Sequence, residues 1–225
     1  MGMTFAQQQT KLSSLLGDSN TGTDDQWPLA TRQLELNRGE LKLAEEAHDL
    51  LGYASGTISS QAITLPSDFL ELGYLLIGGD TILTGKDEIS IQEYQKWINS
   101  GEDKFYFWVN SSNVRQILFI DSNSNSQAYV LYYYRGPSAT LSDDSDESDH
   151  QDQFREAPVY YAAGELLPQI GKYQLANYWK GQFEIMARKA EDKTKKLVME
   201  HIRAYPDIVD EGEFEKDIQG RGLIA

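Results

Sequence analysis

The first part of the chain repeats apolar positions with the period of an α-helix. Residues 4–16 predict a short helix with one apolar stripe. The helix begins at a Thr4–Gln7 capping-box pair and ends before Gly17. A second helix is predicted from about residue 29 to 51, and it is apolar on two faces. A helix of this kind packs between two partners, so we expect it inside a bundle.

Between about residues 60 and 136 the apolar residues follow the period of β-strands instead. The predicted strands are 62–65, 69–77, 81–84, 104–110, 114–121 and 128–135, with a short helix over 90–99. The polar run 122–126 predicts a hairpin between the last two strands. Strand 128–135 is apolar on both faces, so we expect a second sheet or a neighbouring subunit to cover it.

The last third begins with a loop dense in Ser and Asp, which we interpret as a solvated linker. Helices are predicted from about residue 157 to 167 and from 173 to 205, and the second is the only basic segment. Beyond Pro206 the chain has little periodicity.

These elements predict an α+β fold, in which N- and C-terminal helices pack as a helical bundle with a β-rich, sandwich-like insert and an extended C-terminal tail. The expected units are residues 1–60 (N-terminal helices), 61–136 (β-rich insert with one short helix), 137–156 (acidic loop), 157–205 (C-terminal helices completing the bundle) and 206–225 (tail).

Composition excludes several classes of protein. The 225 residues carry a formal net charge of −15 and include no cysteine. Disulfides, Fe–S clusters, thiolate zinc sites and cysteine nucleophiles are therefore excluded. The acidity argues against a sequence-independent grip on nucleic acid, which needs Lys and Arg. No apolar run approaches the roughly 20 residues of a membrane span, and residues 1–16 lack the layout of a signal peptide, so we expect no membrane association.

The sequence motifs for nucleotide binding, metal binding and histidine catalysis are each incomplete. A phosphate-loop pattern near residue 79 has Asp80 and Asp87 where Gly and Ser or Thr are required. The acidic run lacks the Gly and Glu that an EF-hand loop needs. The three histidines are far apart, and each lacks a second ligand three or four residues away. We expect no catalytic residue, no metal and no cofactor.

Two aromatic clusters, 105–108 and 132–134, leave an alternative open. Aromatic side chains stack on sugars or bases, and 35 acidic residues always permit a pair of carboxylates for glycoside hydrolysis. Alternation of faces along a strand favours roles in the core and in interfaces. The alternative function is an acidic carbohydrate-binding or carbohydrate-active protein that uses the aromatic β insert.

Short motifs follow one another in a defined order between about residues 30 and 200. They are Leu36-Asn37-Arg38-Gly39, Leu65-Pro66-Ser67-Asp68-Phe69-Leu70, Leu131-Tyr132-Tyr133-Tyr134-Arg135-Gly136-Pro137, Tyr160-Tyr161-Ala162-Ala163-Gly164-Glu165-Leu166 and Ala176-Asn177-Tyr178-Trp179. In order and spacing, the chain resembles the head–tail adaptor (connector) proteins of tailed bacteriophages.

The resemblance implies a structural virion protein of the phage neck, assembled in the host cytoplasm, with no active site. Such adaptors form a homo-oligomeric ring, usually a dodecamer, which joins the portal protein to the next neck or tail component and continues the DNA channel. Genomic DNA passes through without specific binding, and the net charge of −15 fits this role because a negative lumen repels phosphates.

The tail carries the candidate partner-binding residues. They are Ile208, Phe214, Ile218, Leu223 and Ile224. Sparse apolar anchors in a segment without periodicity suit a chain that becomes ordered on a partner. By analogy with the family, we expect the tail to dock against the portal or a neighbouring protomer.

Overall fold

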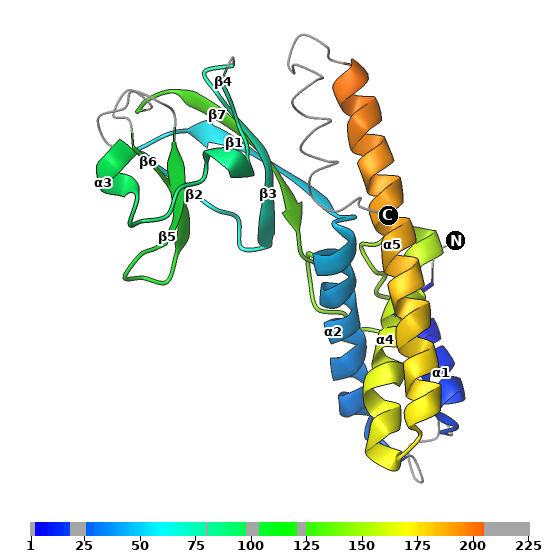
Figure 1. The fold of residues 1–225 in the computed structure, drawn as a ribbon. Helices are drawn as coiled ribbons and strands as arrows, with labels where there is room; N and C mark the ends of the chain where they lie inside the picture. The colour runs from blue at the N-terminus through cyan, green and yellow to red at the C-terminus, as the bar shows by residue number, and fades with distance from the viewer. Residues whose placement is uncertain (1–2, 19–25, 80, 98–103, 121–124, 205–225) are drawn as a thin grey trace.

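The computed structural model describes residues 3–18, 26–79, 81–97, 104–120 and 125–204. A helical part lies beside a β-rich part, and the two are joined where α2 meets β1 (Figure 1). The predicted α+β class, with a helical bundle and a β-rich insert, is confirmed. The predicted tail, residues 206–225, lies outside the described residues.

Four helices build the helical part. They are α1 (Phe5–Leu16), α2 (Leu29–Ala47), α4 (Ala157–Leu166) and α5 (Tyr173–Ala204), with the short 3₁₀ turns η3 (Asp152–Phe154) and η4 (Leu167–Ile170) at the ends of α4. Helix α4 contacts the other three helices. Its fully buried residues include Val159 and Leu166, which share a core with Leu12 and Leu36. The central helix is therefore the one whose apolar residues surround its axis.

The helix ends show which boundaries local chemistry determines. Helix α1 has the predicted capping box at Thr4 and a left-handed Gly17 at its C-terminus. Helix α2 ends at Ala47, short of the predicted residue 51, because His48 adopts a left-handed conformation with φ 50° and donates its N–H to Ala44. Helix α5 ends within one residue of the prediction.

Two antiparallel sheets build the β-rich part. The larger has the order β1-β7-β3-β4, formed by β1 (Leu51–Thr57), β7 (Ala128–Arg135), β3 (Phe69–Ile77) and β4 (Thr81–Leu83). The smaller has the order β2-β6-β5, formed by β2 (Ala62–Thr64), β6 (Arg115–Phe119) and β5 (Phe105–Val109). The turn η1 (Gly85–Asp87) and the short helix α3 (Tyr94–Trp97) lie between β4 and β5. One core contains Leu75 and Leu131 of the larger sheet with Phe105 and Ile117 of the smaller, so the sheets pack face to face.

Two sequence expectations are wrong here. Strand formation begins at Leu51 rather than at residue 61, because β1 follows α2 after three residues and pairs with β7 along its whole length. The hairpin expected between residues 114–121 and 128–135 does not form, since β6 pairs with β2 and β5 while β7 pairs with β1 and β3. Ile117 of β6 and Leu131 of β7 belong to the core between the two sheets, and they come from opposite sheets.

Candidate interaction surfaces

The larger sheet exposes aromatic side chains on the face turned away from the smaller sheet. Strand β7 sends Leu131 and Tyr133 into the core, so Tyr132 points to the opposite face. There the ring of Tyr132 stacks on Tyr74 at 4.4 Å between centroids and meets Tyr53 edge-on at 5.4 Å.

We call this surface the tyrosine face. It comprises Leu51, Tyr53, Tyr74, Val130, Tyr132 and Tyr134. Tyr53 is 59% exposed and Leu51 is 53% exposed, although both lie in an ordered strand. The expectation that both faces of the last strand are covered is met within the described chain on one face alone, which leaves the tyrosine face without a covering layer.

The helical part also exposes apolar residues. Leu34 and Leu41 lie two turns apart on α2, and Tyr178 and Ile185 lie two turns apart on α5. All four are among the large apolar side chains that remain exposed, whereas Leu36 and Leu43 on the other side of α2 are fully buried. Helix α2 is therefore apolar on two faces, as the sequence predicts, and one of them faces outward. We call Leu34 and Leu41, on this outward face of α2, the helix stripe.

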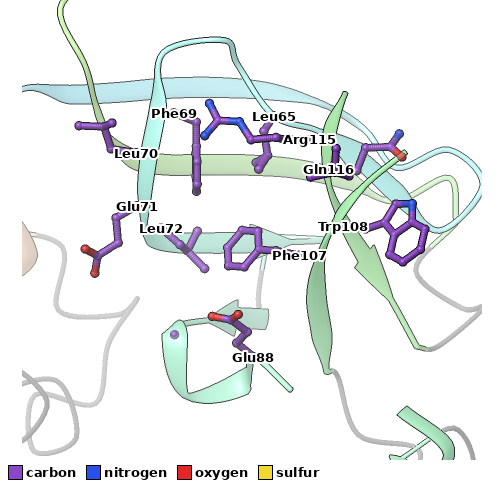
Figure 2. Close-up of a pocket in the computed structure, with 12 residues that line it drawn as sticks. Leu65, Phe69, Leu70, Glu71, Leu72, Glu88, Phe107, Trp108, Arg115 and Gln116 are labelled. Atoms are coloured by element: carbon purple, nitrogen blue, oxygen red, sulfur yellow. The ribbon is translucent and has the colours of Figure 1, made fainter. Parts of the chain in front are cut away.

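A groove of about 360 Å³ opens between β3 and the β5–β6 pair. Figure 2 shows Phe69, Leu72 and Phe107 turned toward one another across it. The guanidinium of Arg115 lies over the Phe69 ring, 5.8 Å from its centroid. The carboxylate of Glu88 lies beneath Leu72 and Phe107, and burial raises the pKa of Glu88 above its ordinary value. The groove therefore combines an apolar floor with one cation and one carboxylate.

The two aromatic clusters singled out in the sequence lie in different sheets and share only core positions, so they do not form one aromatic surface. Residues 105–108 lie in the smaller sheet and residues 132–134 in the larger one. Phe105 and Tyr133 belong to the shared core, as the core interpretation predicts. Phe107 lines the groove, and Trp108, at the groove's end, is 41% exposed.

A buried polar cluster joins the acidic loop to the helices. His150 places Nδ1 2.8 Å from the Asp49 carboxylate and Nε2 3.0 Å from the backbone oxygen of Glu40. The Glu40 carboxylate accepts hydrogen bonds from Gln8 and from the hydroxyl of Ser148. Side chains from α1, α2 and the loop therefore meet at one point inside the protein.

Burial and pairing oppose one another in this cluster. Burial alone lowers the pKa of His150, but the hydrogen bond and charge of Asp49 outweigh it, so the pKa is raised above its ordinary value. Burial raises the pKa of Glu40, although His150 and the hydrogen bonds from Ser148 and Gln8 act in the other direction. Both shifts stabilise the protonated form of the cluster.

The acidic loop, residues 137–156, is not the solvated linker that its composition suggests. Ser148 and His150 are buried. Asp146 accepts hydrogen bonds from the backbone N–H groups of Ser142 and Asp143, and Asp149 pairs with Arg135 at 2.8 Å. Most of the loop's carboxylates therefore have backbone or arginine partners, because a tight loop leaves N–H groups that only side chains can satisfy.

Several residues considered in the sequence lie elsewhere or outside the description. His48 bonds to Glu71 at 3.0 Å, so it is separate from His150. Within the described ranges, no group of His, Asp or Glu is arranged to hold a metal ion. None of the helices among those same residues is long and apolar enough to cross a membrane. The tail residues Ile208, Phe214, Ile218, Leu223 and Ile224 lie outside the described residues.

A helical bundle that carries a β-sandwich and exposes apolar side chains on both parts has the construction of a subunit that assembles with other proteins. Comparison with protein families identifies which assembly. The family model described as SU10 adaptor protein matches residues 3–203, and the chain belongs to this family. It is a family of phage head–tail adaptors, structural proteins of the virion neck, and the resemblance seen in the sequence motifs is confirmed. Among curated proteins no match was found.

Proposed function

We propose that the chain forms a ring of twelve copies in the phage neck, which joins the portal protein to the next neck or tail component. Family membership supports the neck location. The proposal of a ring is supported by two different apolar surfaces on one chain, the tyrosine face and the helix stripe. A closed ring is built from heterologous contacts, in which one surface of each copy meets a different surface of the next.

The exposed residues are large enough to drive such contacts. An aromatic side chain buries on the order of 150–250 Å², and each Å² of apolar surface removed from water is worth about 25 cal/mol. Covering the exposed half of Tyr53 therefore contributes about 2 kcal/mol before the cost of association. A patch of several such residues, with polar residues at its rim, is typical of a protein interface.

The tail supplies a second contact in this proposal. Its apolar residues Ile208, Phe214, Ile218, Leu223 and Ile224 dock against the portal or a neighbouring copy. Deleting residues 207–225 is expected to abolish attachment to portal-bearing capsids. Undiminished attachment of the shortened chain would show that the tail has no such role.

The ring continues the DNA channel without binding DNA specifically. The net charge of −15 supports this part, because like charges keep phosphates from adhering to the channel wall. Gel-shift titration of the assembled ring with duplex DNA at low salt is expected to show no retarded complex. A stable complex there would count against a passive channel.

Light scattering and negative-stain imaging, with and without purified portal, test the ring itself. The wild-type chain is expected to give a symmetric ring, and Tyr53→Asp is expected to prevent it by placing a charge in the apolar contact. The control Gln174→Glu adds one charge at an exposed position of α5 and is expected to assemble normally. A monomer under all conditions would overturn the proposal, and turnover of a polysaccharide would favour the carbohydrate alternative.

A further inference from the structure

Strand β5 is an edge of the smaller sheet, and its backbone shows which groups are free. On the β6 side, the carbonyl of Lys104 accepts the N–H of Ile120, and the N–H of Asn110 donates to the carbonyl of Val114. Because antiparallel pairing alternates, the even-numbered residues of β5 face β6 and the odd-numbered residues face outward. Phe105 agrees with this, since its carbonyl accepts the N–H of Ile89 on the outer side.

The outer edge of β5 has a backbone hydrogen-bond partner at Phe105, where Ile89 donates its N–H, and is unpaired beyond it among the described residues. For the outward backbone groups of Phe107 and Val109, no described residue is a hydrogen-bond partner. The side chains there are apolar and accessible, with Trp108 41% and Val109 51% exposed. Edges are usually protected by charged residues, proline or a bulge, and an open apolar edge is a template for another strand.

The groove lies directly beside this edge. Phe107 belongs to both, and Phe69 and Leu72 of β3 form the opposite wall (Figure 2). The carboxylate of Glu88 faces the groove, and no described side chain or backbone group forms a hydrogen bond or ion pair with it. A segment that presents apolar side chains and one cation on the same face would pack against the apolar floor of the groove and pair with the Glu88 carboxylate.

Residues 213–219 of the tail have that pattern. In an extended strand, Phe214, Lys216 and Ile218 share one face, while Glu213, Glu215 and Asp217 share the other. We propose that residues 213–219 of a second copy add a strand to the open edge of β5, with Phe214 and Ile218 in the groove and Lys216 beside Glu88. This contact deepens the proposed self-assembly and rests on it.

The position of β5 favours a second copy over the same chain. The tail begins after Ala204, at the end of α5, whereas β5 lies beyond β3 of the larger sheet as seen from α5 (Figure 1). A tail returning to its own β5 would have to pass around the larger sheet. A tail from a neighbour has no such constraint, and contacts of this kind run head to tail around a ring.

The absence of cysteine allows a direct test in the full-length protein. One copy carries Glu88→Cys and another carries Lys216→Cys, and the mixture is oxidised and separated on a denaturing gel. The expected result is a cross-linked dimer. In the matched control, Glu215→Cys replaces Lys216→Cys and turns the thiol to the opposite face, so the cross-link is expected to be lost.

A chain with both Glu88→Cys and Lys216→Cys distinguishes the source of the tail. Cross-linked dimers and higher multimers support a second copy, whereas an intrachain link, which migrates as a monomer, overturns it. Equal cross-linking at positions 215 and 216 overturns the strand register and with it the proposal. A ring that still assembles without any 88–216 link overturns this contact and leaves the proposed function standing.

A backbone variant provides a second measurement. Val109→Pro removes an outward N–H at a position where an edge strand tolerates proline, so β5 keeps its bonds to β6. It is expected to lose the 88–216 cross-link while its thermal unfolding stays close to that of wild type. Retention of the cross-link would contradict strand addition. Oligosaccharide-dependent changes in tryptophan fluorescence, without any cross-link, would assign the groove to a sugar instead.

Discussion

The side-chain amide of Asn37 forms two hydrogen bonds with the backbone of Leu141. Its Nδ2 donates to the Leu141 carbonyl at 3.0 Å, and its Oδ1 accepts the Leu141 N–H at 2.8 Å. Asn37 lies on α2, and Leu141 lies in the acidic loop 104 positions later. One side chain therefore replaces the strand partner that the loop backbone lacks, and a motif residue of the adaptor resemblance has a structural role.

Asn37→Ala is expected to destabilise the protein. Both Leu141 backbone groups lose their partner, and each unsatisfied partly buried group costs about 1–3 kcal/mol. Urea denaturation should therefore show a lower free energy of unfolding. The control Asn177→Ala, at an exposed position of α5, is expected to be neutral or slightly stabilising. Equal effects of the two substitutions would refute the role assigned to Asn37.

Gly39 and Gly181 form a second matched pair. A Cβ at Gly39 would lie 2.8 Å from both the Cα and the carbonyl oxygen of Pro158, so α2 and α4 would have to separate. Overpacking of this kind costs about 1–3 kcal/mol, more than the roughly 1 kcal/mol that alanine gains over glycine in a helix. Gly181 has no atom within 4 Å of its added Cβ.

Thermal unfolding should therefore move in opposite directions for the two variants. Gly39→Ala is expected to lower the Tm, and Gly181→Ala is expected to raise it slightly. A rise in both would show that the contact of Gly39 with Pro158 relaxes without cost.

The His150 cluster predicts a dependence of stability on pH. The pKa of His150 is raised above 6.5 in the folded protein, so its contribution is complete below pH 6.5 and is lost as the pH rises through the folded value. Glu40 has the same sign, because its raised pKa favours the protonated folded form, and its contribution is lost as the pH rises above 4.5. The free energy of unfolding should therefore fall as the pH rises above 6.5, through the folded-state pKa of His150.

Urea denaturation across this range checks the assignment. Both His150→Gln and Asp49→Asn are expected to flatten the slope relative to wild type, the first by removing the titrating group and the second by removing the partner that raises its pKa. Identical slopes in all three proteins would mean that another group titrates. The other charged groups around the cluster are Arg155, Glu147 and Asp149, and each stays in place in both variants.

Sequence reasoning locates most elements because local chemistry determines them. The Thr4 capping box and Gly17 define α1, and the run of alternating residues in β7 begins and ends where the structure places it. The sequence pattern does not predict strand β1, because Gly52 and Gly56 interrupt the alternation of apolar residues. The structure explains Gly52, because a Cβ there would overlap the ring of Tyr133, a residue far away in the sequence.

The surfaces were harder to predict than the elements. A period of two shows that Tyr132 and Tyr133 point to opposite faces, but it does not show which face a second sheet covers. The sequence likewise predicts core positions for Phe107 and Trp108. Their exposure follows from the strand order, which places β5 at an edge of its sheet. The alternation of Tyr53 with small residues was a signal for β1 and could have drawn attention to the tyrosine face.

The pairing of β1 with β7 has one more consequence, for how the molecule could be rebuilt. Leu51, where the chain enters the sheets, lies opposite Tyr134, and Arg135 donates its N–H to Leu50 as the chain leaves them. Entry and exit are therefore about 5 Å apart, the spacing of neighbouring strands. The whole β-rich segment is a cassette that a short linker could replace, or that a different domain could occupy, without moving α2 away from the loop that follows.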